Sequence, residues 1–289
     1  MSTWTYVDPD LGELALVEAN GLMVVGYDLG WPAARVVSTS VVNASGEDDL
    51  TEFHDGRLVQ LDVQLVGSPA QRQTAAMRAR SYMRADRRPT LRWDSEAFGE
   101  LWAVGARAQN FNGKVPAGLR QTVTAHVWRV PSGTFVGATE RYAEVVAGTD
   151  TNVGRTYDLT FDRVYPAATG SPGAGTVTVD GTTYAVPTLR MYGPVVNPTV
   201  TIPTTGGYWT FTNNGGLTIA DGDFVEIDVA QRTCLVNGLA GSSVFDKLDF
   251  ATVSWGLLAP GTINTFTYNG TSGLTASTKL GVVFRDTYL

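Results

Sequence analysis

Alternating apolar and polar residues predict a β-strand in the N-terminal half of the chain, at residues 57–66. Successive side chains of a strand point to opposite faces, so this alternation predicts a strand with one face on a core. The residues on that face are Val59, Leu61, Val63 and Leu65.

A helix is predicted directly after this strand. Ser68 suits the N-cap position and Pro69 the first helical position. Small and apolar residues then recur at spacings of three and four, which gives the helix a packing face. These residues are Ala75, Ala76, Ala79, Tyr82 and Met83.

More strands are predicted after the helix, from Leu91 onward and at 100–107 and 120–130. One helix among strands favours an α+β domain or a decorated, split β-barrel over a parallel α/β sheet. The segment 131–156 is longer than an ordinary connection. It is interpreted either as an arm, a β-hairpin that reaches a neighbouring subunit, or as a surface loop.

The C-terminal part reads as all-β. Turn sequences such as Asp180-Gly181 and Asn237-Gly238 separate short alternating runs. About ten short strands at close spacing predict a β-sandwich or jelly roll. The runs are 176–179, 183–186, 199–202, 208–212, 224–229, 233–236, 250–254, 263–268 and 280–284.

Charge divides the chain into two parts. Residues 1–165 hold 36 of the 49 charged side chains, whereas 166–289 hold 13 of them together with 17 glycines. The change falls in a Pro/Gly/Ala/Ser stretch, which has the composition of a linker. We therefore expect an N-terminal domain at 1–165, a linker at 166–175 and a C-terminal domain at 176–289.

Composition excludes several classes of function. The formal net charge of −7 argues against general nucleic-acid binding. The first ten residues lack the features of a signal peptide, and no apolar run is long enough for a membrane helix. Cys234 is the single cysteine, which excludes an internal disulfide, and a buried position is expected for it. Phosphate-loop, dinucleotide and nucleophile-elbow motifs are absent.

Two groups of acidic residues are candidates for chemistry. Glu226 and Asp228 share one face of a predicted strand and could hold a cation or act as a carboxylate pair. Solvated carboxylates are the simpler interpretation. The run at 47–49 (Glu-Asp-Asp) is expected in a solvated loop, with a subunit contact as the alternative.

Arginines gather on and after the predicted helix, in a chain with 18 arginines and 3 lysines. A solvated helix face is one interpretation. Because arginine pairs well with carboxylates at partly buried sites, contact with an acidic neighbouring subunit is the other. The cluster is Arg72, Arg78, Arg80, Arg84, Arg87 and Arg88.

Three aromatic residues of the C-terminal part could stack on a sugar: Tyr208, Trp209 and Trp255. Filling the core of a β-sandwich is the other interpretation, because aromatic side chains bury large areas.

Two motifs carry a resemblance to a known family. Residues 222–238 follow the pattern GD-x-V-x-I-D…R-T-x-x-x-N-G, and a W-x-x-L-x-P-G pattern begins at Trp255. Together they resemble the galectin-like C-terminal domain of the distal tail proteins of long-tailed, siphovirus-type bacteriophages. The tail at 285–289 fits the same family. The alternating strand, the arginine-rich helix and Leu91-Arg92-Trp93 resemble the family's N-terminal ring-forming (belt) domain.

The resemblance implies a structural virion protein, without catalytic residues, cofactor or metal. It implies a hexameric ring at the tail tip, made in the host cytoplasm, with a channel for DNA. The implied partners are other copies of the chain, the tail tube protein, the tape-measure protein, and the tip or baseplate hub with its receptor-binding proteins. Neither specific nucleic-acid binding nor membrane insertion is expected. The expected subunit interface comprises Arg78, Arg80, Arg84, Arg87, Arg88, Phe135, Arg141 and Tyr142.

A host-surface glycan is a further partner to consider, through Tyr208, Trp209 and Trp255. The histidine of the galectin sugar signature has no counterpart in the C-terminal domain. The alternatives are a carbohydrate-binding β-sandwich protein, or a module of a cell-wall-degrading enzyme that uses Glu226 and Asp228 as a glycosidase pair.

Overall fold

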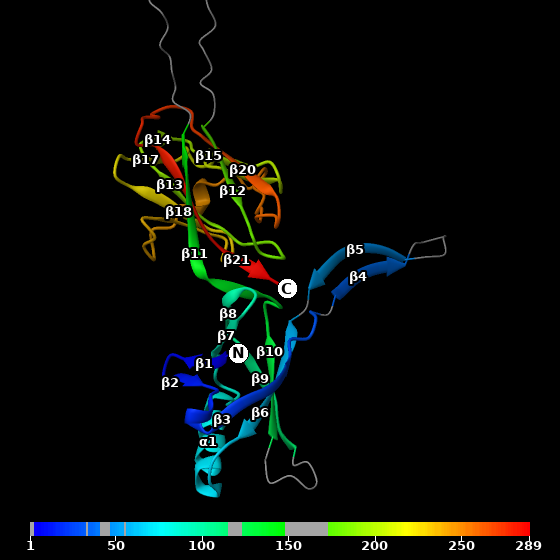
Figure 1. Cartoon of the computed structure of the whole chain (residues 1–289). Helices are drawn as coiled ribbons and strands as arrows, with labels where there is room; N and C mark the ends of the chain where they lie inside the picture. Colours follow the sequence, from blue (N-terminus) through cyan, green and yellow to red (C-terminus); the bar gives the residue numbers. More distant parts are fainter. Residues whose placement is uncertain (1–2, 33, 41–46, 55, 115–122, 148–172) are drawn as a thin grey trace, which may run out of the picture. The chain divides into compact units, whose positions relative to one another are not determined.

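The computed structural model describes residues 3–32, 34–40, 47–54, 56–114, 123–147 and 173–289; for 34–40, 47–54 and 110–114 it describes the backbone only. Within these residues the protein is mainly β with one α-helix, as predicted (Figure 1). It forms two compact units, which we call the first unit (Met1–Ala138 with Thr287–Leu289) and the second unit (Thr139–Asp286).

The unit boundary therefore lies before the predicted linker at 166–175. The part of that linker at 166–172 lies outside the described residues, and 173–175 already belong to a strand.

Antiparallel pairing builds the first unit. One group of strands has the order β8-β7-β1-β2, a four-stranded sheet has the order β3-β6-β10-β9, and β4 pairs with β5. The elements are β1 (Thr3–Asp8), β2 (Gly12–Ala15), the short 3-10 helix η1 (Glu18–Asn20), β3 (Leu22–Asp28), β4 (Ala34–Ser40), β5 (Glu47–His54), β6 (Arg57–Leu65), α1 (Pro69–Tyr82), β7 (Thr90–Ser95), β8 (Gly99–Ala103), β9 (Arg107–Lys114) and β10 (Val123–Val130).

The alternating run forms β6, and all four of its predicted core residues are buried. The predicted strand at 100–107 is instead the end of one strand and the start of another. Val104 and Gly105 form a turn between β8 and β9, and Gly105 has a φ of 68°, a conformation that glycine adopts without strain. The acidic run at 47–49 begins β5 and is therefore not a loop.

The helix begins where the sequence predicts. Ser68 and Gln71 form a reciprocal capping box, in which the Ser68 hydroxyl accepts from the Gln71 amide and the Gln71 side chain accepts from the Ser68 amide. Ala75, Ala79 and Tyr82 are buried. The predicted packing face of α1 therefore covers the core of the first unit.

The segment predicted as an arm or a loop is largely a strand, β11 (Phe135–Val146). Val136 and Gly137 pair with β8 in the first unit, and the later part of β11 neighbours β21 (Lys279–Tyr288). The described part of the segment is therefore built into sheets, and 148–156 lie outside the described residues.

Two antiparallel sheets enclose one core in the second unit, which makes it a β-sandwich (Figure 1). One sheet has the order β19-β18-β13-β21-β11 and the other β12-β20-β15-β16, with β14 and β17 as a separate pair. The remaining elements are β12 (Gly173–Thr178), β13 (Thr188–Tyr192), β14 (Val195–Val196), β15 (Thr199–Ile202), β16 (Gly207–Thr210), β17 (Thr218–Ile219), β18 (Phe224–Asp228), β19 (Thr233–Val236), the 3-10 helix η2 (Phe245–Lys247) and β20 (Ile263–Asn269).

Two predicted strands of this unit, 183–186 and 250–254, form only isolated bridges. Ala185 bridges Leu258, and Ser254 bridges Tyr208. Pro187 follows the first of these runs and has no amide to donate to a ladder. Strand β13, which the sequence interpretation missed, lies between β18 and β21 and contributes buried Leu189 and Met191.

The two motifs of the resemblance have structural roles. The side-chain oxygen of Asn237 accepts from the Phe224 amide at 2.9 Å, and its side-chain nitrogen donates to Asp223 at 2.9 Å. These bonds tie the end of β19 to the start of β18. Buried Asn264 holds the Pro-Gly corner by exchanging hydrogen bonds of 2.8 and 2.9 Å with the backbone of Ala259. The side chains of Asn237 and Asn264 therefore have structural roles.

No helix in the described part of the chain is long and apolar enough to cross a membrane.

Candidate functional site

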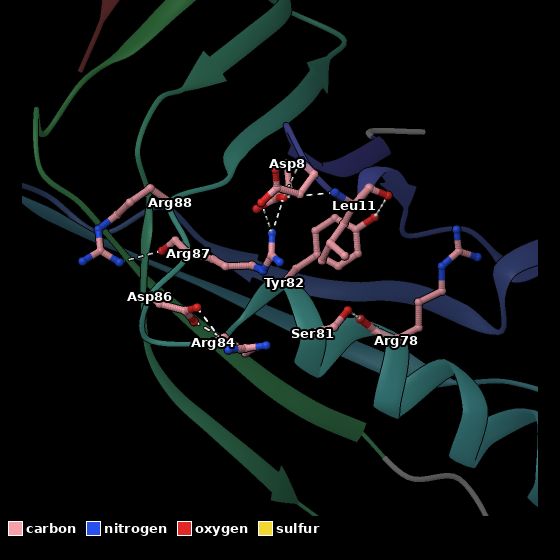
Figure 2. A network of polar contacts seen from close by, with 10 residues as sticks. Asp8, Leu11, Arg78, Ser81, Tyr82, Arg84, Asp86, Arg87 and Arg88 are labelled. Atoms are coloured by element: carbon pink, nitrogen blue, oxygen red, sulfur yellow. Dashed lines mark hydrogen bonds and ion pairs between the residues drawn. The ribbon is translucent and has the colours of Figure 1, made fainter.

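The predicted arginine cluster divides into one internal residue and several exposed ones. Figure 2 shows Arg87 directed at Asp8, whereas Arg78 points away from it. Arg87 Nη1 lies 2.6 Å from Asp8 and 3.1 Å from Asp10. The Arg87 side chain is only 18% exposed. Its two ion pairs connect the segment that follows α1 to the turn after β1.

Asp8 is the centre of this network. Its carboxylate is 3% exposed and also accepts from the amides of Asp10 and Leu11, at 3.0 and 3.1 Å. The Tyr82 hydroxyl donates to the Leu11 carbonyl at 3.1 Å. The arrangement therefore satisfies a buried charge through one ion pair and two backbone donors, and it fixes the end of α1 (Figure 2).

We expect Asp8→Asn to lower the free energy of unfolding by about 2 kcal/mol, because a buried charge-assisted hydrogen bond is lost while Arg87 stays partly buried. Chemical denaturation measures the change. Asp86→Asn is the control, because Asp86 pairs with Arg84 at sites 62% and 63% exposed. Such an exposed pair contributes less than about 0.5 kcal/mol. Equal losses for the two variants would contradict the role given to Asp8.

The other arginines of the predicted interface are on the surface. Arg84 forms its ion pair with Asp86 in solvent, and Arg88 donates to the backbone carbonyls of Ala85 and Arg87. Arg78 and Arg80 are exposed on α1. These four side chains are accessible to a neighbouring subunit, and their place in an interface stays a prediction.

The remaining interface candidates differ in accessibility. Phe135 is 1% exposed within the core of the first unit, so its side chain offers no surface to a neighbour. Arg141 is held inside its own unit by Asp180 and Asp286, at 2.8 and 3.1 Å. Tyr142 is 54% exposed and stays a candidate.

The aromatic residues considered for sugar stacking do not form an open platform. Trp209 is fully buried in the core of the second unit. Trp255 packs against that core, with its ring 6.2 Å from Trp209 and stacked on Phe245. Tyr208 is half-buried. The positions fit core filling better than stacking on a glycan.

The carboxylate pair of β18 is occupied by structural contacts. Glu226 forms an ion pair with Arg190 at 2.8 Å, and Asp228 accepts from the Gln231 amide at 2.9 Å in the turn after the strand. Cys234 is buried, and burial raises the pKa of its thiol to about 12. Among the described residues, no cluster of three or more His, Cys, Asp or Glu side chains could hold a metal.

A buried polar chain in the first unit was not predicted from the sequence. The Trp128 indole donates to the Tyr6 hydroxyl at 3.3 Å, and Tyr6 lies 2.8 Å from His126 Nδ1. His126 Nε2 lies 3.0 Å from the Thr124 hydroxyl, which donates to the Val63 carbonyl at 3.1 Å. The Thr124 hydroxyl donates its proton to the Val63 carbonyl, so it must accept the hydrogen bond from His126 Nε2–H. His126 Nδ1 is then unprotonated and accepts from the Tyr6 hydroxyl. Burial lowers the pKa of His126 to about 4.

The chain was compared with known proteins. No family model and no curated protein matches the sequence. The crystal structure of SPP1 Dit (gp 19.1), described as a paradigm of the hub adsorption apparatus in Gram-positive infecting phages, aligns over 100% of both chains with a TM-score of 0.68 and 11% identity.

Two structures of the activated phage P2 baseplate were also found. The one with Ca aligns at a TM-score of 0.44 and 11% identity, covering 98% of this chain and 97% of that chain. The one with Sr aligns at 0.43 and 12% identity, covering 99% and 98%. The similarity to SPP1 Dit is one of fold over the full length, and it confirms the fold that the resemblance implies.

Proposed function

We propose that this protein is a distal tail protein, a structural component of the tip of a phage tail. The observation that carries the proposal is the similarity to SPP1 Dit, which spans both units and both chains completely. A match over the full length of two units is harder to obtain by chance than a match to one common sandwich. The structural commitments of Glu226, Asp228 and Trp209 support assembly over chemistry or sugar binding.

In this proposal six copies form a ring that joins the tail tube to the tip or baseplate hub, and the ring leaves a channel for the tape-measure protein and DNA. A ring requires one heterologous contact that repeats and closes. The first unit would supply this contact, and the second unit would face away from the ring. The formal net charge of −7 suits a channel that DNA must traverse without being held.

The exposed arginines provide a direct test of the ring contact. We expect the double substitution Arg84→Glu and Arg88→Glu to abolish assembly, because two attractive charges at an acidic neighbour become repulsive. Sedimentation velocity measures the change in mass, and circular dichroism checks that the chain still folds.

Arg232→Glu is the matched control, since Arg232 is an exposed arginine in a turn of the second unit. Assembly should survive this change. A ring of unchanged mass in the double variant would remove Arg84 and Arg88 from the interface, while a wild-type chain that stays monomeric would count against the ring itself.

A further inference from the structure

A pocket in the first unit contains a buried arginine whose Nε has no hydrogen-bond partner among the described residues. This residue is Arg57, the first residue of β6, and it is 2% exposed. Its guanidinium lies 5.3 Å from the centre of the Phe135 ring. Within the described residues, no carboxylate lies close enough to form an ion pair with Arg57. A buried cation is costly in a folded chain unless an anion pairs with it, so this pocket is suited to an anion.

The pocket is already formed in the single chain. It has a volume of about 260 Å³ and is lined by Asp28, Leu29, Gly30, Trp31, Arg57 and Leu289. The Asp28 carboxylate accepts from the Gly30 amide at 2.8 Å, and this bond stabilises the turn at 28–30 that lines the pocket. Gly30 has a φ of 55°, and a Cβ atom there would lie 2.4 Å from the Leu58 carbonyl oxygen. Only glycine therefore keeps this wall in place.

The lining selects the kind of anion. A guanidinium can donate two parallel hydrogen bonds to a carboxylate or to a phosphate. Asp28 already contributes one negative charge to the same pocket, which disfavours a dianionic phosphate. Leu29 and Trp31 add apolar walls that suit the methylene groups of an acidic side chain. A single carboxylate on a short aliphatic stem fits these features best.

We infer that the Arg57 pocket receives an acidic side chain from a second copy of this chain. The inference rests on the proposed ring, in which every copy presents one pocket and one occupant. The chain carries an excess of the complementary charge, because its sequence contains 28 acidic and 21 basic residues. Trp31, at the pocket wall, is 83% exposed, and such a residue is a typical anchor when a partner covers it.

Arg57→Met tests the inference, because methionine fills the buried site without a charge. Removing one partner of a buried, hydrogen-bonded charge pair should weaken self-association at least about 30-fold. The isolated chain should keep or gain resistance to denaturation, since an unpaired buried charge is removed. A residue with a purely structural role would show the opposite pattern. Sedimentation and chemical denaturation give the two readouts.

Arg190→Met is the matched control, because Arg190 is an arginine of the second unit that is already paired with Glu226. It should leave assembly unchanged. Wild-type and Arg57→Met chains that assemble equally well would overturn this inference and leave the proposed function standing. A wild-type chain that stays monomeric would count against both.

Arg57→Lys then identifies the occupant. A carbodiimide joins a lysine amine directly to a carboxylate in contact with it, and mass spectrometry locates the bond. With rings mixed from light and nitrogen-labelled copies, a bond between the two kinds of copy supports the inference. A bond formed only within one copy, such as to Asp28, or no bond in an intact ring, would contradict it.

Discussion

Trp209→Ala is expected to lower the free energy of unfolding of the second unit by about 3–5 kcal/mol. Trp209 is fully buried between the sheets of the sandwich, with the ring of Trp255 6.2 Å away. A Cβ atom at Gly207 would lie 3.0 Å from its ring, so the neighbouring backbone is built close around the indole. The cavity left by the indole could be filled only if the surrounding strands moved. Chemical denaturation followed by tyrosine fluorescence measures the loss.

Tyr208→Ala is the control for this prediction. Tyr208 is the preceding residue on β16 and is half-buried, so less than about 1.5 kcal/mol should be lost. The comparison also bears on function. A small effect of Trp209→Ala on stability, together with a loss of binding to a polysaccharide, would favour the carbohydrate-binding alternative over a core role for Trp209.

Acidification is expected to lower the stability of the first unit through His126. Burial lowers the pKa of His126 to about 4 in the folded chain, against about 6.5 when it is unfolded. The unfolded chain therefore binds the proton first. The contribution of the neutral ring is complete above about pH 6.5 and is lost as the pH falls toward 4, up to about 3 kcal/mol in total. Denaturation at a series of pH values measures the slope.

The structure gives the reason for this sensitivity and a control for it. His126 Nδ1 accepts from Tyr6, and a proton on that nitrogen would remove the acceptor. His126→Asn supplies an oxygen near the position of Nδ1 and does not titrate in this range. We expect this variant to lose the His126 part of the slope, while the slope from the carboxylates remains. Superimposable slopes for the two chains would refute the assignment.

Local signals predicted much of the fold. The alternation in β6 and the Ser68-Pro69 start of α1 depend only on neighbouring residues, and both predictions are confirmed. The turn motifs at Asn237 and in the Pro-Gly corner are likewise local. The strand predicted at 100–107 was wrong, because the turn at Gly105 divides this stretch between two strands.

Contacts between distant residues could not be predicted from these patterns. Asp8 and Arg87 are 79 residues apart, and Tyr6 and His126 are 120 apart. The arginine-rich sequence therefore looked like one surface, although Arg87 belongs to the interior. Arg57 is the first residue of the predicted strand at 57–66, and the pocket that it lines with Trp31 and Leu289 joins residues distant in the sequence.

The similarity to SPP1 Dit is one of fold, and in the proposed function the chain is a structural component of the tail tip. Its polar residues are used to hold turns, to pair buried charges and to present arginines at the surface. The central claim of this account is the ring at the tail tip.

The most direct test is the native mass of the purified full-length chain, with negative-stain images of the same sample. The account predicts a mass of six chains and a ring with a central hole. A single species of one chain at high concentration, with no ring in the images, would contradict it.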